Sequence, residues 1–209
     1  MRNLLKQKKK PDFQISVFSY ENKNIEVFIR RIESMNVRFK VLIFEGKTLS
    51  NFNLVFNTHL NQSDQNELAL SVNIKIQVLP MQNQEDYDRI LISSYINLVR
   101  GEDSIVRAML AGRPFLWNIY PQDNNQHLLK LNALFNLMLE ILPQNYHDTI
   151  ENVRKLNLSY NQVDCSLKDF SIENFYPDWI NLTEKWSSYL LSHKSLTENI
   201  LEFYKYNKE

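Results

Sequence analysis

The sequence predicts an α/β protein in which a parallel sheet covered by helices is followed by a helical tail. Strand and helix patterns alternate between residues 14 and 140, which is typical of parallel strands joined by helices. The chain has only 3 glycines, and Gly101 and Gly112 bracket a strand–turn–helix–turn–strand segment in its middle. Since a glycine turn that ends a strand and opens a helix is where α/β proteins bind phosphates, this segment is the expected ligand site.

The first part of the chain predicts two strands around a helix. Residues 14–20 (QISVFSY) are rich in β-forming side chains and predict a buried strand. Residues 24–35 carry isoleucine and phenylalanine at helical spacing, and residues 39–44 (FKVLIF) predict a second strand. Residues 52–67 are polar and ambiguous, with a short buried piece expected at residues 54–56.

The middle of the chain continues the alternation. Residues 72–79 (VNIKIQVL) predict a strand that stops at a proline, and residues 85–93 predict a short helix. Residues 95–99 form the expected strand that feeds the glycine turn. Residues 104–111 then predict a helix, and residues 115–120 the next strand.

The last third of the chain is helical in pattern. Leucines recur at helical spacing over residues 127–142, and several amphipathic helices follow up to Tyr206. We therefore divide the chain into a disordered or linker-like basic start (residues 1–12), an α/β domain (13–145) and a helical tail (146–209). The tail packs on the α/β domain or reaches toward a partner domain.

Composition excludes several classes of protein. The chain is 44% hydrophobic and 23% charged, as in soluble globular proteins, and its formal net charge of +0 gives no general attraction for nucleic acid or anionic membranes. No apolar run approaches the roughly 20 residues of a membrane span, and no apolar core follows the first lysines as in a signal peptide. The cytoplasm is the expected compartment.

Cysteine and histidine give no sign of a metal site. The single cysteine, Cys165, excludes an internal disulfide and is expected to be an ordinary thiol. The 4 histidines show no metal-ligand spacing, so surface or capping roles are expected.

The residues that follow Gly101 carry the expected binding chemistry. Ser104, preceded by Glu102 and Asp103, lies where a helix is predicted to begin. In one interpretation Asp103 or Ser104 only caps that helix. In the other, free backbone N–H groups and the Ser104 hydroxyl hold a diphosphate while Glu102 accepts hydrogen bonds from a ribose. Arg100 is either a phosphate clamp or one partner of a surface ion pair.

Side chains at other strand ends face the same crevice. Tyr120 and Gln122 follow the strand after the glycine segment, and Tyr20 ends the first strand. In an open parallel sheet these ends lie together, so Tyr20 can offer a flat surface for a base. Each aromatic residue alone is a weak signal, because aromatic residues at strand ends more often pack at the rim of the sheet.

The central segment resembles a known family. Residues 100–122 (RGEDSIVRAMLAGRPFLWNIYPQ) are similar to the signature of the bacterial protein-arginine rhamnosyltransferases that modify translation elongation factor P. Three further segments resemble the same family in the same order, and HLLKLNALFNL and WSSYLL are compatible with it. The three are QISVFSYEN (14–22), FEGKTL (44–49) and VLPMQNQEDYDRIL (78–91).

The resemblance implies a fold and a reaction. Members of the family are inverting glycosyltransferases of the GT-B type, in which two Rossmann-like halves face each other across a cleft. They transfer rhamnose from dTDP-β-L-rhamnose to an arginine of elongation factor P. The donor is held mainly by the C-terminal half, so the chain is expected to be that Rossmann-like half, with residues 13–145 as its nucleotide-sugar-binding domain. No metal or other cofactor is expected.

The resemblance also assigns site residues. The nucleotide-binding motif carries over to Arg100, Glu102, Asp103, Ser104 and Tyr120. Two departures are Met81, where an aromatic residue is usual, and Asn118, where a histidine is usual; Met81 still gives a base an apolar contact. With the strand-end residues, the expected donor-binding set is Tyr20, Met81, Gln84, Arg100, Glu102, Asp103, Ser104, Tyr120 and Gln122.

No catalytic residue is expected in this chain. The family's general base is an aspartate of a D-N-F-G-D-I-G segment in the N-terminal half, which this sequence does not contain. Three expectations follow: an enzyme completed by a separate N-terminal half, a non-catalytic half that binds the nucleotide sugar, or a folded remnant. The expected partners are dTDP-rhamnose, elongation factor P and, for the first of these expectations, that separate half.

Overall fold

The computed structural model describes residues 12–35, 37–61, 68–162 and 171–206. A six-stranded sheet in the order β3-β4-β2-β1-β5-β6 forms its centre. Only the pairing of β3 with β4 is antiparallel. This confirms the predicted α/β class with a mainly parallel sheet. The strands are β1 (Phe13–Val17), β2 (Phe39–Phe44), β3 (Leu68–Ala69), β4 (Ile74–Leu79), β5 (Ile96–Arg100) and β6 (Phe115–Asn118).

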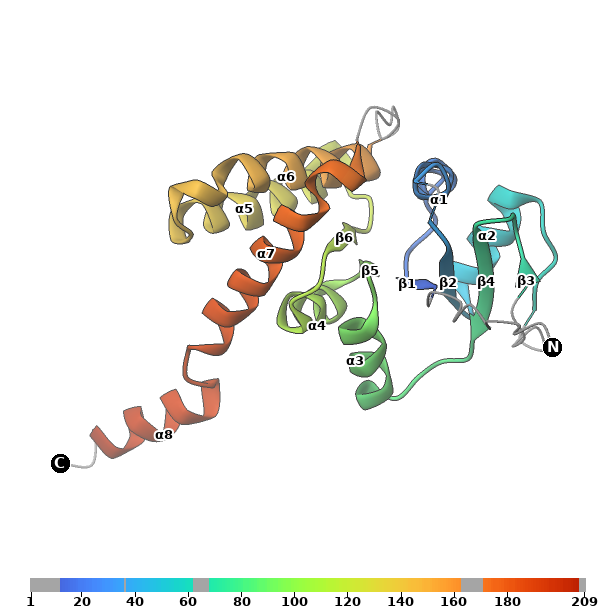
Figure 1. Cartoon of the computed structure of the whole chain (residues 1–209). Helices are drawn as coiled ribbons and strands as arrows, with labels where there is room; N and C mark the ends of the chain where they lie inside the picture. The colour runs from blue at the N-terminus through green and yellow to red at the C-terminus, as the bar shows by residue number, and fades with distance from the viewer. Residues whose placement is uncertain (1–11, 36, 62–67, 163–170, 207–209) are drawn as a thin grey trace, which may run out of the picture.

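Helices cover both faces of the sheet. Because β2 and β4 lie on one side of β1 and β5 and β6 on the other, right-handed crossovers place α1 and α2 on one face and α3 and α4 on the opposite face (Figure 1). The helices are α1 (Asn24–Glu33), α2 (Lys47–Phe56), α3 (Gln84–Ser93), α4 (Glu102–Ala111), α5 (Gln126–Ile141), α6 (His147–Asn161), α7 (Ile172–Leu191) and α8 (Leu196–Tyr206), with short 3-10 turns η1 (Asp123–Asn125) and η2 (Gln144–Tyr146).

The central strands are buried on both faces, as expected for a covered parallel sheet. All of β5 except its last residue is buried, and β2 is buried at every position except Lys40. The Ser16 hydroxyl donates a hydrogen bond to the Asn97 side chain and so joins β1 to β5 inside the core. The Asn97 amide donates to the Leu91 carbonyl, which ties the end of α3 to the same point. The two halves of the sheet are thereby joined at its centre.

Helix α6 covers the edge of strand β6 that has no neighbouring strand. The Asn157 side chain accepts a hydrogen bond from the backbone N–H of Trp117 at 2.9 Å. Asn161 accepts from the N–H of Ile119 at 3.0 Å and donates to the carbonyl of Trp117 at 2.7 Å. These amides replace the neighbouring strand that an edge lacks, so α6 both packs on the sheet and blocks pairing with another chain.

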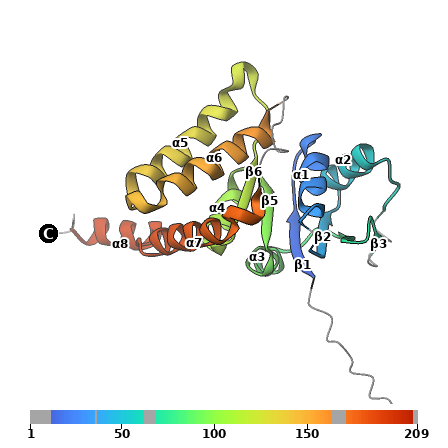
Figure 2. The ribbon, with the colours of Figure 1, turned by 45° about the horizontal axis from the view of Figure 1, so that its top comes forward.

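The helical tail has an anchored part and a projecting part. Trp179 and Trp186 of α7 are buried in the core. Thr183 and Ser187 donate hydrogen bonds to the carbonyls of Gly112 and Leu110 at the end of α4. In contrast, α8 has no buried residue, and both ribbon views show it extending away from the sheet (Figures 1 and 2).

Three local predictions are wrong. Residues 47–56 form a helix, and Leu54 is 79% exposed rather than buried, because Leu49 and Phe52 take the inward positions of α2. Strand β1 ends at Val17 because the N–H of Ser19 leaves the sheet to bond Thr48 Oγ1. Strand β6 likewise ends at Asn118, not at residue 120.

Other predictions lie beyond what the structure tests. Cys165 and most of the basic start fall outside the described residues. Within the described ranges, no helix is long and apolar enough to cross a membrane.

Candidate functional site

The predicted site lies where the order of the sheet reverses. From β1 the chain moves outward through β2 and β4, then returns to the other side of β1 with β5 and β6. In such sheets, ligands bind beyond the carboxyl ends of the strands at this reversal. Tyr20 follows β1, Arg100 ends β5 and Tyr120 follows β6, so three predicted residues come from strands that lie side by side.

A glycine turn opens helix α4 toward this crevice. Gly101 has φ 60° and ψ 169°, a conformation that residues with a side chain rarely adopt. Helix α4 begins at Glu102, two residues before the predicted start, and no side chain caps it. The prediction that Asp103 or Ser104 is the cap is therefore wrong. The first bond of the helix runs from the Ile105 N–H to the Gly101 carbonyl, so the N–H groups before it have no hydrogen-bond partner among the described residues.

The two acidic residues of the first turn of α4 pair with different basic side chains. Glu102 is exposed and pairs with Lys130 of α5 at 3.5 Å. Asp103 accepts a hydrogen bond from Arg107 Nε at 2.9 Å, while the other end of Arg107 reaches both carboxylate oxygens of Asp88 at 3.0 Å. Arg107 thus links α4 to α3, and Asp103 helps to fix α4, whereas the Glu102 carboxylate stays accessible.

Arg100 lies on aromatic rings. Its guanidinium carbon is 4.1 Å from the centre of the Phe18 ring and 5.1 Å from that of Tyr20. Among the residues that the structure describes, no carboxylate pairs with Arg100, so the ion-pair interpretation is not supported. Stacking positions the guanidinium plane without using its N–H donors, which remain available for an anion.

Tyr20 and Tyr120 form the adjoining wall. Their rings meet edge to face with centres 5.4 Å apart. The N–H of Tyr20 donates to the Asn118 side chain at 2.8 Å. Asn118 thereby fixes the loop after β1 to the end of β6. Gln122 is exposed, and its backbone N–H donates to His127 Nδ1 at 3.2 Å.

Met81 and Gln84 lie beyond the end of β4. Met81 is 59% exposed, and its N–H donates to the Glu45 carboxylate at 2.9 Å. Gln84 is the exposed first residue of α3. In the described part of the chain, no hydrogen bond, ion pair or ring contact joins Met81, Gln84 or Gln122 to the cluster around Arg100.

An aromatic cluster that was not predicted from the sequence connects Arg100 to α3. The rings of Phe18, Phe44 and Tyr87 meet pairwise with centres 5.3–5.6 Å apart. The Tyr87 hydroxyl is buried near Ser104 without reaching hydrogen-bond geometry. Burial raises the pKa of Tyr87 to about 12, with Asp103 acting in the same direction. Tyr87 lies one helical turn after Gln84 in the same family-like segment, which was the signal that could have identified it.

Two neighbouring grooves open at this edge of the sheet. One of about 280 Å³ is lined by Tyr20, Glu21, Lys47, Tyr120 and Pro121. A second of about 320 Å³ extends past Asn118 and Asn161 and shares Glu21 and Pro121 with the first. Glu21 and Pro121 therefore lie on the wall between the grooves.

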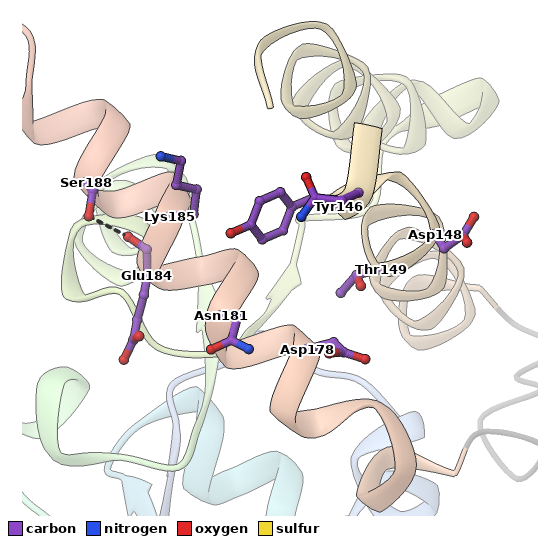
Figure 3. A pocket seen from close by; sticks show the side chains of 9 residues that line it. Tyr146, Asp148, Thr149, Asp178, Asn181, Glu184, Lys185 and Ser188 are labelled. Atoms are coloured by element: carbon purple, nitrogen blue, oxygen red, sulfur yellow. Dashed lines mark hydrogen bonds between the residues drawn. The ribbon is translucent and has the colours of Figure 1, made fainter. Parts of the chain in front are cut away.

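A larger cavity lies elsewhere, between α7 and the start of α6. It measures about 630 Å³ and contains none of the predicted site residues. Its polar side chains, among them Tyr146, Asp178 and Lys185, project from both sides (Figure 3). Size alone therefore does not identify the site, because the glycine turn, the sheet reversal and the arginine all lie at the strand ends.

The chain resembles proteins of known activity along nearly its whole length. It matches the family model of the elongation factor P (EF-P) rhamnosyltransferase EarP over residues 2–205. It is 31% identical over 199 residues to a protein-arginine rhamnosyltransferase of Pseudomonas aeruginosa, covering 91% of this chain and 50% of that protein. A Shewanella oneidensis protein of the same name is 28% identical over 208 residues, covering 96% and 52%.

A solved structure shows the same fold. It comes from work on the structural basis for EarP-mediated arginine glycosylation of translation elongation factor EF-P. The TM-score is 0.77 at 24% identity, over 93% of this chain and 60% of that one. The chain thus spans about half the length of the curated relatives it matches.

Proposed function

The chain belongs to the EarP family of EF-P rhamnosyltransferases, and we propose that it forms the dTDP-rhamnose-binding part of an enzyme that rhamnosylates an arginine of EF-P. One observation carries the proposal most directly. At the reversal of the sheet, Arg100 is stacked on Phe18 and Tyr20 beside the uncapped start of α4. A cation and open N–H groups in one place are what a diphosphate requires.

The diphosphate of the donor binds at the start of α4. Backbone N–H groups after Gly101 and the Ser104 hydroxyl donate to its oxygens, and the positive end of the helix dipole adds attraction. Arg100 contributes two parallel N–H donors in a fixed plane. The same groups act during the reaction, because negative charge develops on the diphosphate as it leaves the sugar.

The nucleoside lies toward α3. Glu102 has an exposed carboxylate that can accept hydrogen bonds from ribose hydroxyls. Met81 provides an apolar contact for the base, and the aromatic cluster of Phe18, Phe44 and Tyr87 supports this side of the crevice. Gln84 offers an amide for the edge of a pyrimidine.

The transfer itself requires a base that these residues do not supply. In an inverting reaction, a guanidinium nitrogen of the acceptor attacks C1 of rhamnose, the bond from C1 to the diphosphate breaks, and the nitrogen loses a proton. Because the pKa of a guanidinium is above about 12, a placed carboxylate must orient it and take the proton. We propose that this group lies on the other half of a two-domain GT-B arrangement.

Calorimetric titration of the purified chain with dTDP, with UDP as the comparison, tests the donor site. We expect binding with a preference for dTDP, and we expect Glu102→Ala and Ser104→Ala to abolish it while the fold is kept. Glu140→Gln, an exposed carboxylate on α5, is the matched control that leaves binding unchanged. Normal binding by both site variants would show that the site assignment is wrong.

A binding part without transfer activity is the second candidate, because the chain covers about half of its curated relatives. Its donor site would be the same. Incubation of the chain with dTDP-rhamnose and EF-P, followed by mass spectrometry of the factor, separates the two: added rhamnose identifies the enzyme, and donor binding without addition identifies the binding part.

A further inference from the structure

Glu21 is a carboxylate with two grooves beside it and no partner in the described residues. It is exposed, forms no hydrogen bond or ion pair there, and lies on the wall shared by the grooves of about 280 and 320 Å³. It directly follows Tyr20, whose ring contacts both Arg100 and Tyr120. A free carboxylate is therefore placed next to the proposed diphosphate site without belonging to it.

We propose that Glu21, together with the exposed ring of Tyr120, receives the guanidinium group of the acceptor arginine. The inference rests on the proposed function and names the side of the crevice that the acceptor enters. A carboxylate binds a guanidinium through two parallel hydrogen bonds, and an aromatic ring binds its flat face. Tyr120 is 62% exposed, so its ring has surface left for a ligand.

The molecule already contains one example of this recognition. The guanidinium of Arg100 lies over Phe18 and Tyr20, which shows that the aromatic residues of this loop accept such a group. The Tyr20–Tyr120 contact brings a further ring to the same wall. Arg100 has aromatic contacts but no carboxylate partner in the described residues, and Glu21 with Tyr120 would give the acceptor guanidinium both.

The charges around the grooves indicate an order of binding. Lys47 lines the first groove and Lys23 the second, and Arg100 lies close to Tyr20, so the empty site repels a cation. A bound diphosphate offsets this positive charge. The acceptor guanidinium is then expected to bind better after the donor, and Glu21 acts as a positioning residue that holds the nucleophile toward C1 of the sugar.

The test is an NMR titration of the isotope-labelled chain with N-acetyl-arginine amide, with and without saturating dTDP. The neutral isostere N-acetyl-citrulline amide and N-acetyl-lysine amide are the comparison ligands. We expect millimolar binding of the arginine compound that shifts resonances of the Tyr20–Asn22 and Tyr120–Pro121 segments, is stronger with dTDP, and exceeds that of both comparison ligands. Glu21→Gln should weaken it about threefold to fivefold, the upper part of the range for an exposed ion pair, whereas Glu140→Gln should not.

The outcomes separate this inference from the donor proposal. If dTDP binds the wild type and Glu21→Gln equally but arginine binds no better than citrulline or lysine, the inference is wrong and the donor site stands. Equal arginine affinity of the wild type and Glu21→Gln also overturns it. If dTDP itself does not bind to the folded wild-type chain, the proposed function fails first.

Discussion

The starts of α3 and α4 solve the same chemical problem in different ways. Each helix leaves backbone N–H groups without intrahelical partners. At α3, the Asn83 side chain accepts a hydrogen bond from the Asp86 N–H at 2.9 Å and donates to the Asp86 carboxylate at 2.8 Å. At α4, Gly101 has no side chain to offer, its φ is positive, and no side chain caps the helix.

The two helix starts differ in whether a side chain of the protein satisfies their N–H groups, and this separates a structural helix start from a candidate binding site. A helix start closed by its own side chain is complete and needs no ligand. A start that follows glycine at the reversal of the sheet lacks this side-chain hydrogen bond, so its N–H groups are available to an anion in the proposed function. Helix α2 begins in a similar way after Gly46, at φ 82° and without a side-chain cap, beside Lys47 of the first groove.

Gly101→Ala should have the largest effect. A side chain at φ 60° and ψ 169° costs about 1–3 kcal/mol of backbone strain, and relief of that strain would rotate the N–H groups away from the diphosphate. We expect a lower free energy of unfolding by denaturant and loss of dTDP binding by calorimetry. Gly112→Ala, at φ 65° and ψ 25°, is the control: it should also lose stability but keep binding. Parallel loss of binding in both variants would attribute the effect to general destabilisation.

Arg100→Lys should weaken dTDP binding about tenfold or more while the free energy of unfolding changes by less than about 0.5 kcal/mol. Lysine keeps the charge but has neither the flat face that lies on Phe18 nor two parallel donors. Calorimetry and denaturant unfolding of the same sample measure both quantities. Wild-type affinity in this variant would mean that a point charge is sufficient and that stacking has no part in binding.

Asn83→Ala should show the opposite pattern. Loss of the side-chain cap of α3 is expected to lower the free energy of unfolding by about 1 kcal/mol. The dTDP affinity should stay within about twofold, because the cap points to its own helix rather than to a ligand. A strong loss of affinity would show that the closed helix start also serves the site.

The candidate site could be proposed from the sequence because its strongest signals are local. Gly101 marks the turn in the sequence itself, and the alternation of patterns fixes the parallel sheet around it. The partners of the site residues were not predictable in the same way, because they depend on tertiary packing. The contact of Arg100 with the Phe18 ring and the hydrogen bond from the Tyr20 N–H to the Asn118 side chain join residues about eighty to one hundred positions apart.

Helix α2 was missed for a related reason. Its sequence, KTLSNFNLVF, contains asparagine and serine, which favour turns when judged locally. Asn51 is nevertheless buried and donates to the Asn22 carbonyl, and Thr48 bonds the backbone of Ser19. Hydrogen bonds to the loop after β1 thus stabilise helix α2 although Thr48 and Asn51 have a low helix propensity.

Tyr87→Phe should have the smallest effect at neutral pH and a clear effect at high pH. Its hydroxyl is buried without a hydrogen bond, so its removal should not lower the free energy of unfolding at pH 7. Burial raises the folded-state pKa from 10.0 to about 12, which means that the fold favours the protonated form. This contribution to the free energy of unfolding is fully present below pH 10 and is lost as the pH rises from 10 toward 12, up to about 2–3 kcal/mol.

The Tyr87→Phe variant should therefore lose less stability than the wild type between pH 10 and pH 12. Some loss is expected in the variant too, because the buried Tyr95 and Tyr176 also have raised pKa values. Denaturant unfolding at pH 7 and near pH 11 measures the difference, and identical losses in both proteins would mean that Tyr87 is in contact with solvent beside the open start of α4.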